Sequence, residues 1–182
     1  MSKIVILGAG IAGHTAAAHL RRKLGKEHEV LVVSPNSNYQ WVPSNIWVGI
    51  GRMKPKDVIF PLEPLYKRKG IGYKQAKGVA FYPEGSSEEQ KPHIIAEYVA
   101  GEKKGQQEKI TYDYLINATG PRLAFDQTEG LNPGENEMYS VCTYGHAQHA
   151  AEGLKILEEK LKKSDKKLKV VIGTGHPKAT CQ

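Results

Sequence analysis

Buried strands and one-sided helices follow one another at the start of the chain. Residues 3–7 form a nearly uninterrupted apolar run that ends at Gly8, a pattern typical of a strand buried on both faces of a parallel sheet. From Ile11 to Lys23, alanine and leucine recur at helical spacing, and Gly25 marks the end of the helix. Glu29–Val33 is a second apolar run. The three segments predict a strand–helix–strand unit of about 30 residues.

The middle of the chain alternates in shorter segments. Ser34–Gly51 shows neither helical nor strand periodicity but is rich in Asn, Ser, Pro, Tyr and Trp. This composition indicates a loop with a defined conformation, which we expect to line a site. Pro61–Lys69 predicts a short helix that Gly70 ends. Four short β-like segments then predict a strand followed by a small antiparallel meander: Tyr73–Ala76, Val79–Tyr82, His93–Val99 and Lys109–Tyr112.

The last third repeats the opening of a nucleotide-binding unit. Asp113–Gly120 predicts a strand that ends in a small-residue turn, and Thr143–Lys163 predicts a helix with one apolar stripe. Leu168–Ile172 predicts a final strand before a second glycine turn at Gly173. We therefore expect an α/β fold with a Rossmann-like domain and meander over 1–120. Residues 121–182 would supply a linker, a helix and the first strand and turn of a second Rossmann-like domain.

Composition adds little to this picture. The 182 residues are 40% hydrophobic and carry a formal charge of +7, which is compatible with an anionic partner such as a nucleotide or an acidic lipid. Much of the excess lies between Lys155 and Lys169, where a solvated helix end explains it, and we expect no nucleic-acid partner. With two cysteines, the chain is not a disulfide-stapled scaffold.

No segment suggests a membrane span or an export signal. No stretch approaches the roughly 20 apolar residues that a spanning helix needs. The chain begins directly with the predicted strand, so we expect it on the cytoplasmic side. His146 and His149 have a spacing that can hold a metal, but no third ligand is evident, and we expect no metal.

The first strand and helix enclose a G-x-G-x-x-G loop. In that setting the first glycine permits a tight turn, the second lets backbone amides approach a pyrophosphate, and the third brings the helix close to the strand. The helix N-terminus adds N–H donors and a positive dipole end. We expect the whole loop to bind a dinucleotide: Gly8, Ala9, Gly10, Ile11, Ala12 and Gly13.

The end of the second strand lacks the acidic residue that usually holds the ribose hydroxyls. Ser34 stands there, followed by Pro35. The ribose contact is therefore weaker or made differently. Nearby, His14 is expected to be a helix residue near the pyrophosphate, while Tyr39, Trp41 and Trp47 form either an aromatic wall beside the cofactor or a loop core.

The order of motifs resembles a known flavoprotein family. GAGIAG, the meander, YDYLINATG and a second glycine turn occur together in the FAD-dependent pyridine nucleotide-disulfide oxidoreductases, which include glutathione reductase and the type II NADH dehydrogenases. The resemblance implies FAD as the cofactor. It also implies that a second turn contacts the flavin nucleotide through Ala118, Thr119 and Gly120.

Two longer segments, residues 42–51 and 140–147, look like those of the sulfide:quinone oxidoreductases. By that resemblance, Val42 and Pro43 pass near the flavin ring, and Ser34 and Pro35 lie near the adenosine. The chain would be the N-terminal part of a membrane-peripheral enzyme, inactive alone. The membrane-binding element would lie in sequence beyond it. Whether the protein forms a homo-oligomer is left open.

Cys142 and Cys181 are the candidate catalytic residues. Each stands near the expected start of a helix, where the dipole favours the thiolate, although an isolated cysteine is also commonly a small buried hydrophobe. In the resembled enzymes three cysteines hold sulfur while electrons pass from sulfide through FAD to quinone. The third would lie outside this chain.

The second glycine turn bears on the electron donor. Lys178 occupies the place of a third glycine, which disfavours NAD(P)H binding at this turn. Sulfide is therefore favoured over NAD(P)H as the electron donor. A type II NADH:quinone reductase stays open as an alternative, as does a truncated, non-catalytic FAD-binding module. A flavocytochrome sulfide dehydrogenase would require an export segment.

Overall fold

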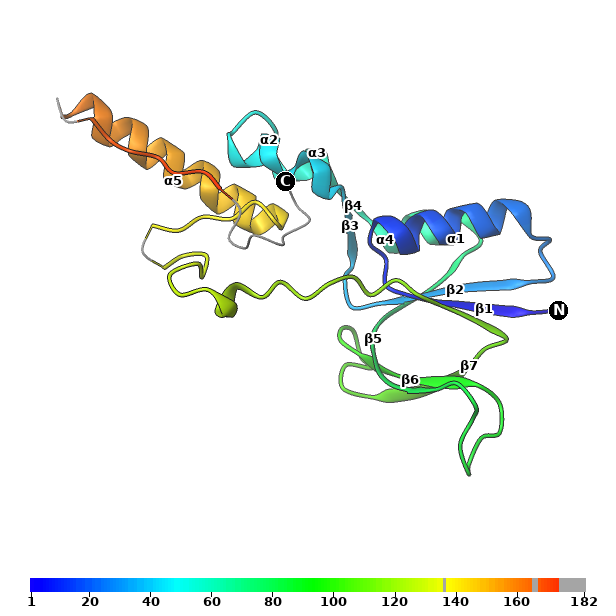
Figure 1. Ribbon diagram of the computed structural model, residues 1–182. Helices are drawn as coiled ribbons and strands as arrows, with labels where there is room; N and C mark the ends of the chain where they lie inside the picture. The colour runs from blue at the N-terminus through cyan, green and yellow to red at the C-terminus, as the bar shows by residue number, and fades with distance from the viewer. Residues whose placement is uncertain (136, 165–166, 174–182) are drawn as a thin grey trace. The chain divides into compact units, whose positions relative to one another are not determined.

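The computed structural model describes residues 1–135, 137–164 and 167–173 (Figure 1). They form two compact units. The first unit contains Met1–Gln40 and Phe60–Pro121, and the second contains Trp41–Ile59 and the chain from Arg122 onward. Strands β3 (Asn38–Gln40) and β4 (Ile59–Pro61) pair where the chain leaves the first unit and returns to it.

The first unit is built on one six-stranded sheet with the order β7-β6-β5-β2-β1-β8. β1, β2, β8 and the first part of β5 are parallel, whereas β6 and β7 continue the sheet in antiparallel pairing. The strands are β1 (Lys3–Leu7), β2 (Glu29–Ser34), β5 (Gly72–Tyr82), β6 (His93–Tyr98), β7 (Gln107–Thr111) and β8 (Tyr114–Asn117).

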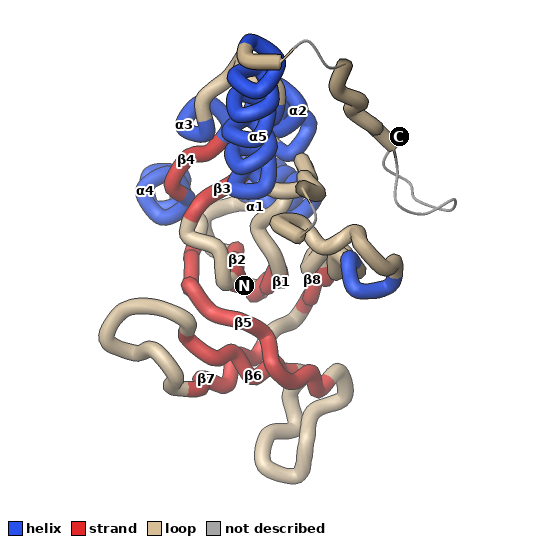
Figure 2. The backbone as a smooth tube through the Cα atoms, turned by 90° about the vertical axis from the view of Figure 1, so that its left-hand side faces the viewer, coloured by secondary structure: helices blue, strands red, loops and turns tan. Residues whose placement is uncertain are grey.

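Two predicted segments are one strand. β5 runs without a break from its pairing with β2 into its pairing with β6, as Figure 2 shows. The register shifts between Gly78 and Ala80, which is the irregularity of a β-bulge. Gly78 therefore bends the strand rather than ending it, and the strand connects the parallel sheet with the meander.

Each face of the parallel sheet carries its own core. Helices α1 (Ile11–Lys23) and α4 (Leu62–Lys69) cover one face, and the strands β5 to β7 curl past the other (Figure 1). Under the helices, alternate residues of β1 and β2 such as Ile6 and Val32 pack with Ala17, Leu62 and Tyr66. The alternate residues Val5, Leu31 and Val33 face the other way. They form the core toward the meander with Ala76, Ile94, Ala96, Ile110 and Tyr112. The uninterrupted apolar runs predicted this burial on both faces.

The second unit packs short helices against one long helix. It contains the 3₁₀ turn η1 (Val42–Ser44), α2 (Asn45–Gly49), α3 (Pro55–Val58), the 3₁₀ turn η2 (Phe125–Gln127) and α5 (Tyr144–Lys162). Val48, Val58 and Ala147 form its core. The predicted loop over residues 34–51 therefore contains a strand and short helices that no period revealed.

The C-terminal prediction differs from the structure. Residues 168–172, expected as a strand, carry no regular secondary structure and are exposed. A strand needs a neighbour that pairs its N–H and C=O groups, and within the described part of the chain these residues have no strand partner. None of the described helices is long and apolar enough to cross a bilayer.

Candidate functional site

Three turns of the first unit meet at one edge of the sheet. Because β1, β2 and β8 are parallel neighbours, their carboxyl ends lie side by side. Backbone hydrogen bonds connect the turns that follow them: Gly8 N–H donates to Val33 C=O, and Ala118 N–H donates to Leu7 C=O, both at 2.8 Å. The predicted residues of the glycine loop, of the Ser34 turn and of the Ala118 turn are thereby brought together.

The three glycines of the loop meet different surroundings. A Cβ on Gly8, whose φ is +98°, would come within 2.2 Å of the Ala118 carbonyl oxygen. A Cβ on Gly13 would come within 2.0 Å of the Gly8 carbonyl oxygen. A Cβ on Gly10 would meet nothing within 4 Å. Protein packing thus requires the outer two glycines, whereas the middle one borders open space that a ligand can approach.

The start of α1 offers backbone donors to that space. Gly10 is the N-cap and has no side chain to accept from the first turn, which contains no acidic residue. The first intrahelical bond runs from His14 N–H to Gly10 C=O, at 2.9 Å, so the N–H groups of the first turn have no helical partner. A pyrophosphate fits here, because it would accept from these donors and lie at the positive end of the dipole.

The turn after β2 has no carboxylate but is held by hydrogen bonds. Ser34 is buried, and its Oγ accepts from Asn36 N–H at 3.3 Å. Tyr73 Oη donates to Asn36 C=O at 2.6 Å, and Gln75 Nε2 donates to Pro35 C=O at 3.3 Å. The sequence pattern did not single out Tyr73 or Gln75, since their role depends on the pairing of β5 with β2.

The turn after β8 is shaped by Asn117. Its Oδ1 accepts from Thr119 N–H at 3.3 Å and from Thr119 Oγ1 at 2.9 Å. Gly120 has a φ of +76°, and a Cβ on it would meet nothing within 4 Å. Asn117 was not predicted, although an asparagine followed by a small-residue turn is a recognisable signal for this local bonding.

His14 belongs to a buried aromatic cluster. Its Nδ1 lies 3.1 Å from Tyr66 Oη, and its ring lies 4.7 Å from that of Tyr39. Tyr39 stacks on Phe60 at 4.8 Å. Burial lowers the pKa of His14, and the charge of Lys69 lowers it further. The lowered pKa favours the neutral imidazole of His14, and Tyr39 packs in the core of the first unit.

The other predicted site residues lie in the second unit. Val42 and Pro43 form η1, and the side chains of Trp41 and Trp47 are exposed, with the Arg52 guanidinium 5.9 Å from the Trp47 ring. Cys142 is half-buried, and its N–H donates to Ser140 Oγ at 3.1 Å. It directly precedes Thr143, which caps α5 by accepting from His146 N–H at 3.2 Å. Cys181 lies outside the described residues.

The family model for pyridine nucleotide-disulphide oxidoreductases matches residues 2–176. The chain belongs to this family. A sulfide-quinone reductase of Aquifex aeolicus is 29% identical over 156 residues, which are 86% of this chain and 31% of that protein. An external alternative NAD(P)H-ubiquinone oxidoreductase of Arabidopsis thaliana mitochondria is 26% identical over 129 residues, 71% of this chain and 21% of that protein.

The same fold occurs in a solved structure of a family member. The sulfide:quinone oxidoreductase of Aquifex aeolicus matches with a TM-score of 0.70 at 24% identity, over 87% of this chain and 33% of the other. The expected Rossmann-like fold and family resemblance are confirmed. The chain spans about a third of the length of this relative.

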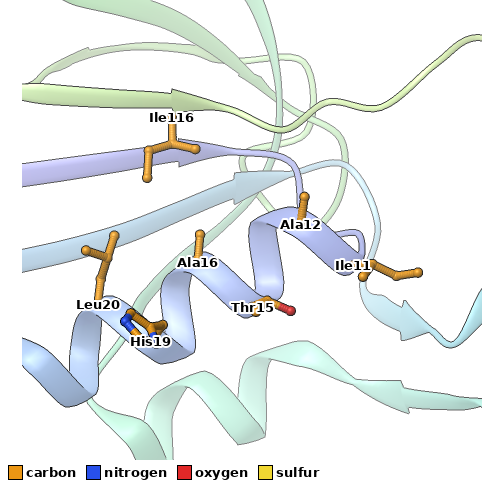
Figure 3. Close-up of a pocket in the computed structure, with 7 residues that line it drawn as sticks. All are labelled: Ile11, Ala12, Thr15, Ala16, His19, Leu20 and Ile116. Atoms are coloured by element: carbon orange, nitrogen blue, oxygen red, sulfur yellow. The ribbon is translucent and has the colours of Figure 1, made fainter.

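An apolar groove runs beside the site of this pyridine nucleotide-disulphide oxidoreductase (Figure 3). This shallow hollow is open to solvent, has a volume of about 520 Å³ and is lined by Ile11, Ala12, Thr15, Ala16, His19, Leu20 and Ile116. The groove shares Ile11 and Ala12 with the glycine loop, but its wall is almost entirely apolar. The hollow therefore offers few hydrogen-bond donors to phosphate groups.

Proposed function

We propose that this chain is the FAD-binding part of an oxidoreductase that oxidises sulfide and reduces quinone. The observation that carries the proposal is the open space at Gly10, in the turn after β1, whose neighbours in the sheet, β2 and β8, end at the same edge. The similarity to a sulfide-quinone reductase over most of the chain supports the choice of substrates. Because quinones are lipid-soluble, we propose that the reaction takes place at a membrane surface, on its cytoplasmic side.

Each turn has its own part of the cofactor in this proposal. The backbone of Gly8 to Gly13 holds the pyrophosphate, and Ser34 with Pro35 borders the adenosine. Ala118, Thr119 and Gly120 contact the flavin nucleotide, and Val42 with Pro43 borders the flavin ring. When bound, FAD would accept two electrons and pass them to quinone.

Cysteine sulfur would hold the oxidised product. Hydrosulfide loses two electrons, its sulfur stays bound to a cysteine at the zero-valent level, and quinone takes up the two electrons with two protons to become quinol. We assign this sulfur carriage to Cys142 and Cys181. The half-buried Cys142 directly precedes Thr143, the N-cap of α5, and this position supports its part.

An anaerobic visible spectrum tests the proposal. The test uses the whole oxidoreductase of which this chain is proposed to be the FAD-binding part; it is purified and loaded with FAD, and sulfide and NADH are added in separate cuvettes. Bleaching of the flavin band by sulfide but not by NADH is expected. Failure to retain FAD would overturn the binding assignment, and a retained flavin that neither donor bleaches would leave a non-catalytic FAD-binding module.

A type II NADH:quinone reductase is the second candidate. The similarity to the plant NAD(P)H-ubiquinone oxidoreductase favours it. The lysine at position 178, where a third glycine would bring helix and strand together, speaks against a nicotinamide site there; it lies outside the described residues. Bleaching by NADH alone would decide for this candidate.

A further inference from the structure

Two side chains of β5 reach across to the turn that follows β2. The phenol of Tyr73 donates to the Asn36 carbonyl at 2.6 Å, and the amide of Gln75 donates to the Pro35 carbonyl at 3.3 Å. Pro35 and Asn36 themselves are exposed. Two consecutive carbonyls of this exposed turn thus accept hydrogen bonds from side chains of the neighbouring strand β5.

The pairing register explains why these two side chains can act together. In the parallel pairing of β2 with β5, Val32 lies opposite Tyr73 and Ser34 lies opposite Gln75. Residues two apart on a strand project from the same face. Lys74, between them, projects from the other face and forms an ion pair with Glu108 at 3.0 Å.

A third hydrogen bond lies within the turn itself, from Asn36 N–H to Ser34 Oγ. Ser34 is buried at the end of β2, where related folds commonly place a carboxylate for the ribose. Without that carboxylate, a bound adenosine could form hydrogen bonds only with the backbone groups of the turn and with the Ser34 hydroxyl. The directions of these groups therefore determine the contacts. Those directions depend on the two bonds from β5.

We propose that Tyr73 and Gln75 are positioning residues for the adenosine half of the cofactor, acting through the Ser34–Asn36 turn. The inference rests on the proposed FAD site and adds two residues to it. Neither side chain has to touch the ligand. In place of a carboxylate side chain, the site then has a backbone turn. The hydrogen bonds from Tyr73 and Gln75 hold this turn against β5.

The surroundings of Tyr73 keep its phenol protonated, so that it can donate a hydrogen bond. Its ring lies 5.7 Å from that of Tyr66, in the core under α1 and α4. Burial, followed by the charge of Glu63, raises the pKa of the Tyr73 phenol to about 12. The hydroxyl therefore keeps its proton throughout the neutral and mildly alkaline range.

Ligand binding to Tyr73→Phe, Gln75→Met and the double variant tests the proposal. FAD affinity is measured by flavin fluorescence, and ADP affinity by displacement of FAD. We expect each lost hydrogen bond to weaken FAD and ADP by the same factor, about two- to tenfold. Tyr114→Phe, which changes an exposed tyrosine on β8, is the matched control and should bind as the unaltered chain does.

The outcomes separate three cases. If the variants bind FAD and ADP as tightly as the unaltered chain, the positioning role is wrong while the FAD site stands. A loss for FAD without a loss for ADP would place the effect at the flavin end and also overturn the proposal. If the unaltered chain binds neither ligand, the proposed function itself fails. If Tyr73→Phe does not fold, Gln75→Met still tests the proposal, because it removes one of the two hydrogen bonds and leaves the aromatic core unchanged.

Discussion

Gly13 on α1 faces the carbonyl oxygen of Gly8 so closely that a Cβ on Gly13 would come within 2.0 Å of it. Both partners are backbone, so no side chain can swing away to relieve the contact. We expect Gly13→Ala to lower the free energy of unfolding by about 1–3 kcal/mol, the usual range for overpacking. Urea unfolding followed by circular dichroism measures this. An unchanged midpoint would show that α1 shifts without cost.

Gly10→Ala separates ligand binding from stability. The Gly10 φ of −71° suits alanine, and its Cβ would meet open space, so we expect a stability change of about 1 kcal/mol or less. FAD affinity should fall by at least about tenfold, since the methyl would enter the space of the pyrophosphate. Flavin fluorescence titration checks the affinity. Equal FAD binding by Gly10→Ala and the unaltered chain would remove the pyrophosphate from this position.

The strand–helix–strand unit and the glycine loop could be read from the sequence because the decisive signals are local. An apolar run, a G-x-G-x-x-G loop and a helical stripe need no knowledge of distant residues. Helix α2 was missed since its buried side is set by α5, far along the chain, where Ala147 packs against Val48. The same limit applies to Tyr73, whose site role follows from strand pairing.

Gly78 illustrates a pattern with two meanings. The sequence predicts two β-like segments, Tyr73–Ala76 and Val79–Tyr82, on either side of Gly78, yet the pairing of β5 with β6 continues across this glycine through a register shift. Local propensity could not decide, because a glycine that ends a strand and a glycine in a β-bulge look alike in sequence. The prediction of a strand over residues 168–172 was wrong for a related reason. An apolar run forms a strand only where a neighbouring strand can pair with its N–H and C=O groups.

The meander should lose a stabilising interaction in acid. Burial by itself would raise the pKa of Glu108, but hydrogen bonds from Tyr98 and Lys74 and the charges of Lys74 and Lys103 outweigh it and lower the pKa below its ordinary 4.5. A lowered folded pKa means that the contribution is present above the unfolded value and lost as the pH falls through the folded value. Below 4.5, Glu108→Gln should therefore approach the unaltered chain in stability.

Thermal unfolding of the unaltered chain and Glu108→Gln, from neutral pH to below the ordinary carboxyl pKa, measures this convergence. Glu97→Gln, on the neighbouring strand β6, is a useful comparison because it changes an exposed carboxylate that accepts a hydrogen bond from Gln107 Nε2 at 3.2 Å. A constant difference between Glu108→Gln and the unaltered chain at every pH would contradict the role of the ionised carboxylate.

Thr143 should control both the start of α5 and the chemistry of the cysteine before it. Its Oγ1 accepts from His146 N–H, so Thr143→Ala should cost about 1 kcal/mol of stability. Fraying of the first turn would also expose Cys142 and speed its alkylation, measured peptide by peptide in a mass spectrometer. Thr143→Ser keeps the acceptor and should restore both values. Unchanged alkylation in Thr143→Ala would show that access to Cys142 does not depend on the cap.

The cysteines decide whether sulfide is the electron donor. If Cys142 and Cys181 carry sulfur, Cys142→Ala and Cys181→Ala, each made in the whole oxidoreductase, should slow sulfide-dependent bleaching of the flavin by at least about tenfold, because hydrosulfide loses its acceptor. FAD affinity should stay unchanged, since neither residue belongs to the three turns around Gly10. Ser140→Ala is the matched control beside Cys142: it removes the acceptor of the Cys142 N–H but leaves the thiol. Sulfide bleaching at the unaltered rate in both cysteine variants would overturn the sulfur-carrier assignment while leaving the FAD site intact.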